Sequence, residues 1–172
     1  MKPENDNVFT DAAFAKRIVD YFSCQFMSKD IFFDPCAGED GKCIHSSKPG
    51  KAFYNAMPEP RYYTELTEGT DCVDFNKKVQ WVFTNPPFSA KSYRKVAKHC
   101  AKISDNVVFL CRLDVSLGTY ARINDMREEG HNLREIIVVD YKDAGFAARG
   151  FVLAVFHWQK TPGQLTKWTY WK

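Results

Sequence analysis

The sequence predicts an α/β fold built on a mostly parallel sheet that ends in an antiparallel hairpin. Strand-like apolar runs and helix-like segments follow one another along the chain. Residues 106–111 are almost continuously apolar, as a strand buried on both faces should be. Residues 135–140 and 151–158 form two further strand-like runs joined by about ten residues. A parallel crossover needs about a dozen residues or more, so this pair should be antiparallel.

The bulk composition indicates a globular protein. With 172 residues, 45% of them hydrophobic and 15% aromatic, the chain is expected to form one domain over residues 1–172 with an apolar core. It contains no apolar run of about 18 residues, so no membrane span is expected. The first six residues are polar and include acids, unlike a secretory signal. We therefore expect a cytoplasmic protein.

The chain begins with a predicted helix over residues 7–22, preceded by an approach strand. Thr10 and Asp11 are both residue types that cap helix N-termini, and either could cap this one. The apolar side chains of this segment recur at helical spacing and predict its buried face: Phe14, Ile18 and Phe22.

Two short strands are expected next, at residues 31–33 and 61–66. The connection between them contains helix-breaking residues, namely Pro49, Gly50, Pro58 and Pro60. We therefore expect an irregular loop over residues 42–60, with at most a short helix over residues 51–57.

The middle of the chain predicts a strand at residues 79–83 and an amphipathic helix at residues 89–103. The helix presents basic residues on one face and apolar residues on the other, the latter being Val96, Cys100 and Ile103. The basic residues are Lys91, Arg94, Lys95, Lys98 and Lys102. They form either a solvated helix face or a surface that contacts phosphates.

The C-terminal part predicts one more helix and an aromatic tail. Residues 116–129 are expected to form a helix that ends at Gly130 and turns Tyr120, Ile123 and Met126 inward. The tail, residues 161–172, holds Trp168, Tyr170 and Trp171. These rings could stack on nucleic-acid bases or pack back on the sheet, and packing is favoured.

The strand at residues 79–83 leads into Asn85-Pro86-Pro87-Phe88. The two prolines fix φ and donate no N–H, so ladder pairing stops and a stiff segment stands at the C-terminal end of the strand. Ligands of open α/β sheets bind at this edge. The Asn85 amide oxygen and a backbone carbonyl can accept both protons of an NH₂ group, and Phe88 can stack on a ring. The segment therefore predicts a site for a planar group that carries an amino group.

Asn85-Pro86-Pro87-Phe88 resembles motif IV of the amino-methyltransferases that use S-adenosylmethionine (SAM), above all the DNA adenine-N6 methyltransferases. The resemblance implies a Rossmann-like class I methyltransferase fold with a mostly parallel seven-stranded sheet. It also implies methyl transfer to N6 of adenine in DNA. Asn85 and the Pro86 carbonyl would hold the amino group on the stiff Pro86-Pro87 segment, and Phe88 would stack on a flipped or single-stranded base.

Further segments resemble the SAM-binding motifs of the same family. Asp34-Pro35-Cys36-Ala37-Gly38 resembles motif I, in which Asp34 would face the methionine amino group while Ala37 and Gly38 pack on the cofactor. Val8-Phe9-Thr10 resembles motif X, whose Thr meets the SAM carboxylate near a helix N-terminus. The resemblance therefore places Phe9, Thr10, Asp34, Pro35, Ala37 and Gly38 at the cofactor.

Two more acids complete the implied cofactor site. Glu65 fits the motif II position, where an acid accepts hydrogen bonds from the ribose diol. Asp71-Cys72 resembles motif III, which contacts the adenine ring of SAM, and Asp74 is the competing candidate. Asn85 would close the site from the strand beside it.

The chain departs from the family pattern in three ways. Asp11 stands where motif X has proline, and Glu39 and Asp40 both separate Gly38 from Gly41. Only the short segment of residues 89–104 and the tail lie outside the core elements after Phe88, and neither has room for a target-recognition region that reads the major groove. We therefore expect weak sequence specificity, or recognition supplied by a partner or a second copy of the chain. Such minimal enzymes resemble those of phages, so the expected host is a bacterial or phage-infected cell.

Two alternatives remain open at this stage. The same Asn-Pro-Pro-aromatic segment occurs in RNA and protein-glutamine methyltransferases, so another planar amino group could be the substrate. The altered glycine loop and the absent reader fit a catalytically inactive regulatory protein that binds SAM or nucleic acid.

Other function classes find little support. The six cysteines contain no C-x-x-C pair and are expected to be reduced thiols. Cys36, Cys43 and His45 match no common zinc spacing, so no metal is expected. The net charge of +3 permits binding to nucleic acid without requiring it.

Overall fold

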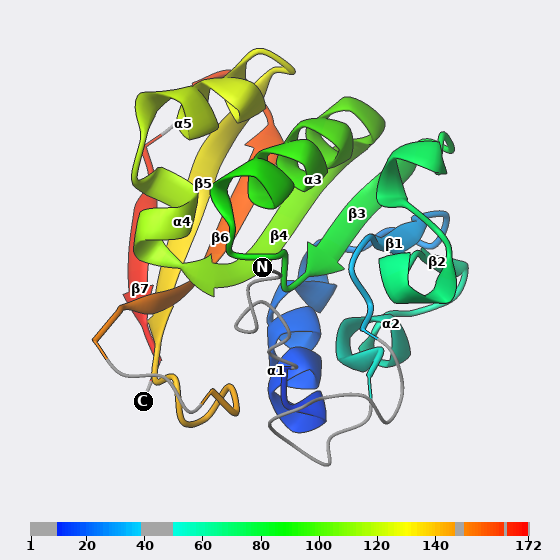
Figure 1. Cartoon of the computed structure of the whole chain (residues 1–172), viewed down its shortest axis with the longest axis horizontal. Helices are drawn as coiled ribbons and strands as arrows, with labels where there is room; N and C mark the ends of the chain where they lie inside the picture. The colour runs from blue at the N-terminus through cyan, green and yellow to red at the C-terminus, as the bar shows by residue number, and fades with distance from the viewer. Residues whose placement is uncertain (1–9, 39–49, 147–149, 164, 172) are drawn as a thin grey trace.

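The computed structural model describes residues 10–38, 50–146, 150–163 and 165–171. These residues form one twisted sheet with helices on both faces (Figure 1). The fold class predicted from the sequence is therefore confirmed.

The sheet has seven strands in the order β2-β1-β3-β4-β6-β5-β7. Six of them run in the same direction, and β6 is antiparallel to both of its neighbours, β4 and β5. The predicted hairpin of β5 and β6 is thus confirmed. The strands are Phe32–Asp34 (β1), Arg61–Tyr63 (β2), Val79–Thr84 (β3), Ser104–Arg112 (β4), His131–Val139 (β5), Leu153–Lys160 (β6) and Lys167–Tyr170 (β7).

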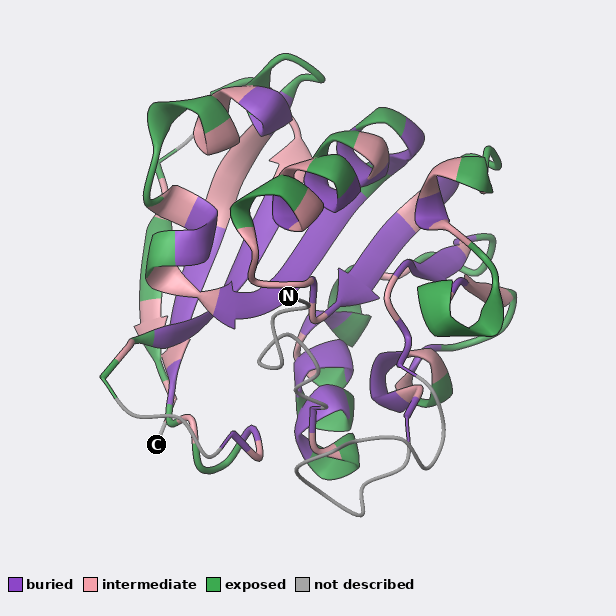
Figure 2. Cartoon of the chain, in the orientation of Figure 1, coloured by how far each residue is buried: buried purple, intermediate pink, exposed green. Residues whose placement is uncertain are grey.

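Helices cover the two faces of the sheet separately. One face carries α1 (Ala12–Phe22) and α2 (Ala52–Ala56), and the other carries α3 (Ala90–Ile103), α4 (Leu113–Leu117) and α5 (Tyr120–Arg127). Three short 3₁₀ turns lie at Ser23–Gln25 (η1), Leu66–Glu68 (η2) and Cys72–Asp74 (η3). The strands in the middle are buried on both sides, whereas each helix keeps an exposed outer face (Figure 2).

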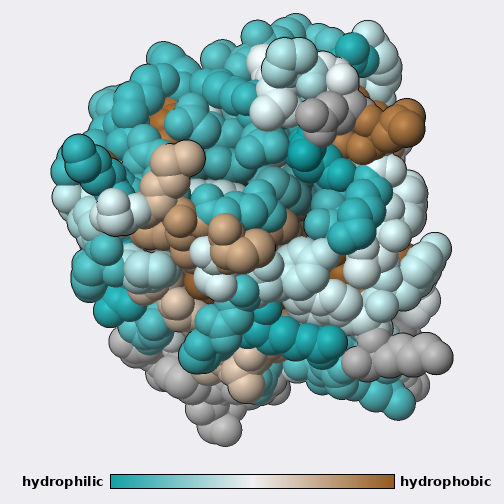
Figure 3. Space-filling view, turned by 180° about the vertical axis from the view of Figure 1, so that it is seen from behind, coloured by the Kyte–Doolittle hydropathy of each residue, from teal (hydrophilic) through white to brown (hydrophobic). Residues whose placement is uncertain are grey.

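Alternation along the central strands divides the core into two halves. In β3, Trp81 and Phe83 pack toward α1, while Val82 between them packs toward α3. Such two-sided burial explains why these strands are apolar throughout. Trp81 also satisfies a buried acid, because its Nε1 donates to Asp30 Oδ2 at 2.9 Å. The side that carries α1 and α2 has a largely hydrophilic outer surface with small apolar areas (Figure 3).

Several local predictions are confirmed. Asp11 caps α1, accepting hydrogen bonds from the amides of Ala13 and Phe14 at 2.9 and 3.3 Å. The short helix expected within residues 51–57 is α2. Phe14, Ile18 and Phe22 are buried on the sheet side of α1.

The helix predicted over residues 116–129 is wrong in its extent. Two helices, α4 and α5, occupy residues 113–127 and are separated at Gly118. The guanidinium of Arg122 donates to the carbonyls of Asp114 and Val115, which ends α4 by satisfying its last carbonyls. Tyr120 therefore begins a new helix and is 74% exposed rather than buried, whereas Met126 is buried as predicted.

The aromatic tail packs on the sheet. It forms β7, a parallel edge strand beside β5, so the hairpin is not the last element of the sheet. The indole of Trp171 lies edge-on to Phe14 and Tyr21 of α1, with ring centroids 6.2 and 5.2 Å apart. Trp168 and Tyr170 are 51% and 70% exposed. The packing role is thus confirmed for Trp171.

The basic face of α3 is engaged by acids. Arg94 and Lys98 bind the buried carboxylate of Asp125 on α5, and Lys95 pairs with Asp71. Three of the five basic residues therefore serve to join α3 to its neighbours.

The described part of the chain adds three observations on thiols, metals and membranes. The thiols of Cys24, Cys36, Cys72, Cys100 and Cys111 are free, as predicted. Within the described ranges no group of three or more potential ligand side chains is placed to hold a metal ion. No helix in these ranges has the length and apolar character to cross a membrane.

Candidate functional site

Three parallel strands bring polar groups to one edge of the sheet. Asp34 is the last residue of β1, Glu65 follows β2 by two residues, and Asn85 follows β3 directly. Because β2, β1 and β3 are adjacent and parallel, their C-terminal ends lie side by side. This is the edge at which open α/β sheets bind ligands.

Asp34 is a buried acid, 1% exposed, at the centre of this edge. Burial raises its pKa to about 7, and a hydrogen bond from the Cys36 amide opposes that rise. The Cys36 N–H donates to Asp34 Oδ1 at 3.2 Å. No described Lys, Arg or His forms an ion pair with the Asp34 carboxylate. A buried carboxylate of this kind fits an incoming cation such as an ammonium group.

The segment after β1 is locked to the segment after β2. Gly38 N–H donates to Glu65 Oε2 at 2.7 Å, and the Thr64 hydroxyl donates to the Pro35 carbonyl at 3.0 Å. Ala37 N–H donates to the Thr64 carbonyl at 3.2 Å. Pro35, Ala37 and Gly38 are all buried. The segments that resemble motifs I and II are therefore parts of one structure.

Glu65 has a second role that the sequence did not indicate. Its Oε1 accepts from the amide and the hydroxyl of Thr67, at 3.1 and 2.9 Å, and so caps η2. Both carboxylate oxygens are thus already hydrogen-bonded. A carboxylate has about four acceptor positions, so Glu65 keeps capacity for a diol.

Asp71 and Cys72 lie on the α3 side of the same region. Asp71 Oδ1 accepts from Val73 N–H at 3.2 Å and caps η3, and its other oxygen pairs with Lys95, which lowers the pKa of Asp71. Cys72 is buried in the apolar cluster that contains Phe33 of β1, and Cys36 packs against this cluster. The structure therefore brings Cys72 close to the Asp34 segment and leaves Asp71 held by the fold.

Thr10 is buried beside the start of α1. Its hydroxyl has no hydrogen-bond partner among the described residues. The next amide, Asp11 N–H, donates to the Ala144 carbonyl at 3.1 Å and ties the helix start to the loop after β5. A buried hydroxyl at a helix N-terminus fits an anionic group such as a carboxylate. Phe9, Glu39, Asp40 and Gly41 lie outside the described residues.

Asn85, Pro86, Pro87 and Phe88 form a non-helical link between β3 and α3. Pro86 is buried, and the other three are half-buried. The Phe88 ring stacks on Phe146 from the loop after β5, with centroids 6.1 Å apart and planes 13° from parallel. The sequence did not reveal Phe146, because it lies 58 positions away with no motif around it.

Comparisons with known proteins support the fold. No protein-family model and no curated protein sequence matches the chain. Among solved structures, the chain is similar to the M protein of the type I restriction enzyme EcoKI, with a TM-score of 0.62, 16% identity and coverage of 94% of this chain and 46% of that one. The chain thus spans less than half the length of that M protein.

The chain is also similar to the solved structures of two proposed methyltransferases. One is a proposed class I SAM-dependent methyltransferase from Listeria monocytogenes, with a TM-score of 0.62, 11% identity and coverage of 96% and 66%. The other is a proposed RNA methyltransferase from Pyrococcus horikoshii, with a TM-score of 0.54, 13% identity and coverage of 88% and 83%. This chain has the fold of the class I SAM-dependent methyltransferases.

Proposed function

We propose that this protein binds SAM at the C-terminal edge of β1, β2 and β3 and transfers its methyl group to N6 of adenine in DNA. The observation that carries the proposal is the position of Asn85 and Pro86. They follow β3 directly, next to the strand that ends at the buried acid Asp34. The acceptors for a substrate amino group, Asn85 and Pro86, therefore lie on the same sheet edge as Asp34, the acid that suits a cation.

The residues present fit the cofactor. The buried carboxylate of Asp34 suits the methionine ammonium, and the Thr10 hydroxyl at the start of α1 suits the methionine carboxylate. The remaining acceptor positions of Glu65 suit the ribose hydroxyls. Bound SAM supplies a methyl group attached to a positively charged sulfur.

Asp71 and Cys72 would complete the site at the adenine ring. The Lys95 ion pair fixes the Asp71 side chain on α3, so the carboxylate keeps a defined orientation. The Cys72 backbone N–H, at the start of η3, would then face a ring nitrogen. Pro35, Ala37 and Gly38 would line the cofactor with backbone and small side chains.

The substrate amino group is held by acceptors. The Asn85 side-chain oxygen and the Pro86 carbonyl accept hydrogen bonds from its two N–H groups, which favours the pyramidal nitrogen of the transition state. Bound SAM would supply the methyl group to this nitrogen, which would release one proton to water. Phe88, supported by Phe146, stacks on the base. A base inside a duplex cannot reach this edge, so it must be flipped out or single-stranded.

The similarity to the EcoKI M protein (EC 2.1.1.72) favours adenine in DNA as the substrate. The chain covers 46% of that protein, so sequence recognition is proposed to come from a partner or a second copy. The similarity to a proposed RNA methyltransferase keeps an RNA base as the second candidate.

The decisive experiment combines transfer of labelled methyl groups from SAM with calorimetric SAM binding. Single-stranded DNA, duplex DNA, RNA and protein extract are offered in parallel to the wild type and to three variants. Asn85→Ala should leave the Kd for SAM within about threefold and lower kcat by about 100-fold or more, because its contact forms mainly in the transition state. Glu65→Ala should weaken SAM binding first, and Asn55→Ala, at an exposed position on α2, is the matched control.

The outcomes separate the candidates. Label recovered as N6-methyladenine in DNA supports the proposal, and label confined to RNA or to protein contradicts it. Saturable SAM binding without transfer to any acceptor would support the inactive regulatory alternative. Equal loss of SAM affinity and turnover in Asn85→Ala would remove Asn85 from the catalytic role.

A further inference from the structure

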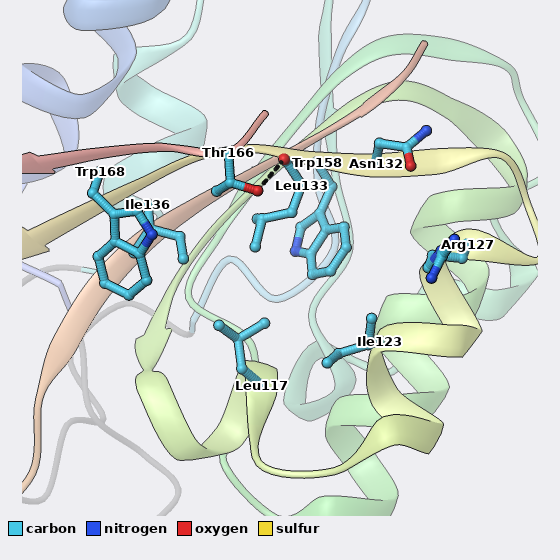
Figure 4. A pocket seen from close by; sticks show the side chains of 9 residues that line it. All are labelled: Leu117, Ile123, Arg127, Asn132, Leu133, Ile136, Trp158, Thr166 and Trp168. Atoms are coloured by element: carbon cyan, nitrogen blue, oxygen red, sulfur yellow. Dashed lines mark hydrogen bonds between the residues drawn. The ribbon is translucent and has the colours of Figure 1, made fainter. Parts of the chain in front are cut away.

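A pocket lies between the sheet and the α4–α5 layer, away from the sheet edge that forms the candidate SAM site. It is open to solvent and has a volume of about 380 Å³. Leu117 and Ile123 reach into it from the helices, opposite side chains of β5, β6 and β7 (Figure 4). By register, Trp158 lies opposite Val107 in the middle of β4, whereas Asn85 lies beyond the end of β3. The pocket therefore belongs to another part of the molecule.

The walls of this pocket are apolar and aromatic. They are formed by Leu117, Ile123, Leu133, Ile136, Trp158 and Trp168. Trp168 is 51% exposed and stands at the rim on the edge strand β7. The volume falls in the range of small-molecule sites, which are mostly apolar with a few placed polar groups. A flat hydrophobic ligand could lie against the exposed indole of Trp168.

Most polar groups of the lining are already satisfied within the protein. Asn132 Nδ2 donates to the Thr161 carbonyl at 2.5 Å, and the Thr166 hydroxyl donates to the Leu133 carbonyl at 2.9 Å. These two side chains hold the pocket in shape, so they offer little to a ligand.

Trp158 is different. It is 1% exposed, and its Nε1–H has no hydrogen-bond partner among the described residues. Figure 4 shows this nitrogen on the side of the ring that faces Leu133. A buried donor without a partner costs free energy that an acceptor in the pocket would recover.

Arg127 supplies a positive charge to the same pocket. It lies on the last turn of α5, is exposed, and forms no ion pair with another described residue. The neighbouring cations Arg94 and Lys98 are both paired with Asp125. Arg127 is thus available for an anionic group on a ligand.

We propose that this pocket binds a small aromatic anion, with its ring against Trp168 at the rim, one oxygen of its anionic group on Trp158 Nε1–H and the other on Arg127. Its chemical class is an aromatic carboxylate. The site is separate from the proposed SAM site and does not depend on methyl transfer.

The test uses 2-naphthoate and its neutral counterpart 2-naphthalenemethanol as probes, titrated calorimetrically into the intact chain. We expect saturable one-to-one binding of the naphthoate and about tenfold weaker binding of the alcohol. Arg127→Gln should weaken the naphthoate about tenfold without changing the alcohol, because a charge-assisted hydrogen bond is lost. Trp158→Phe should weaken both probes several-fold, because it removes the indole N–H, although it also makes the buried ring smaller.

Lys29→Gln, which removes an equal charge at an exposed position, is the control and should bind both probes as the wild type does. Arg127 is exposed, so its variant tests the proposal even if Trp158→Phe fails to fold. Absence of saturable naphthoate binding at 1 mM (about −4 kcal/mol at that Kd) would overturn the proposal. Binding that neither Arg127→Gln nor Trp158→Phe changes would overturn it as well.

Discussion

At the scale of single residues, the strongest feature is the buried carboxylate of Asp34. Its environment disfavours the charged form, because burial removes water and the hydrogen bond from the Cys36 amide only partly replaces it. The carboxylate is consequently poised to change protonation near neutral pH. A cation bound beside it would stabilise the charged form.

If the proposed function is correct, this environment predicts how SAM binding depends on pH. With the pKa of Asp34 at about 7, the acid must lose a proton before it can pair with the methionine ammonium at lower pH. The Kd for SAM should therefore rise up to about tenfold per unit as the pH falls below 7, and should be constant above it. Asp34→Asn should bind at least about tenfold more weakly at pH 8, with no such pH dependence. Calorimetry between pH 5.5 and 8.5 measures both.

The same residue gives an independent check on stability. A carboxyl whose folded-state pKa is raised from 3.8 to about 7 stabilises the fold fully below pH 3.8, and this contribution is lost as the pH rises through 7. Asp34→Asn should therefore gain stability relative to the wild type between pH 5 and pH 8. Urea unfolding that shows the same difference at both pH values would contradict the raised pKa.

At the scale of elements, the break between α4 and α5 shows how one glycine sets a boundary. The apolar periodicity of residues 116–129 continues through Gly118, so the pattern predicted one helix. In the structure Gly118 N–H donates to the Asp114 carbonyl at 3.0 Å, and Arg122 takes the neighbouring carbonyls. A Cβ at position 118 would lie 2.1 Å from the Asp114 oxygen.

Gly118→Ala should therefore destabilise the protein. The clash is with backbone, which cannot turn aside, and we expect a loss of about 1–3 kcal/mol in the free energy of unfolding. Gly163→Ala is the matched control, because a Cβ there meets nothing within 4 Å. Urea denaturation of both variants measures the difference. Equal stability of the two variants would show that the α4–α5 turn relaxes without cost.

The basic residues of α3 show a second feature of an element that its own sequence does not predict. Their spacing identified a charged helix face, but it could not say what neutralises the charge. The acids that do so, Asp71 and Asp125, come from η3 and α5. The face therefore joins three elements, and its phosphate-binding capacity is smaller than its composition indicates.

At the scale of the whole molecule, the C-terminal strand closes the sheet onto the first helix. Trp171 N–H donates to the Val138 carbonyl at 2.9 Å, and its ring packs on Phe14 and Tyr21 with Arg17 above it at 4.4 Å. The two ends of the chain are thereby joined across β5.

Trp171→Ala should lower the free energy of unfolding by about 2–4 kcal/mol, because it removes buried ring contacts and leaves a gap over α1. Tyr170→Ala, at a neighbouring position that is 70% exposed, should change it by less than about 0.5 kcal/mol. Thermal and urea unfolding of the two variants provide the comparison. If the two losses were the same, the tail would not be part of the cooperative fold.

The sequence by itself determined the features that depend on neighbouring residues. Two prolines ended β3, Asp11 capped α1, and the ten-residue connection made β5 and β6 antiparallel. These signals are short-range, since steric limits on φ, capping and loop length act within a few residues. They were sufficient for the fold class and for the order of the candidate site residues.

Only the tertiary structure decided which distant groups meet. In the folded chain, Glu65 accepts a hydrogen bond from Gly38, Asp71 forms an ion pair with Lys95, and Phe88 stacks on Phe146. It also added β7 to the sheet and opened the pocket beside Trp158. Such contacts join residues that are far apart in the chain, and burial and desolvation there depend on the packing of several elements at once. No local pattern carries that information.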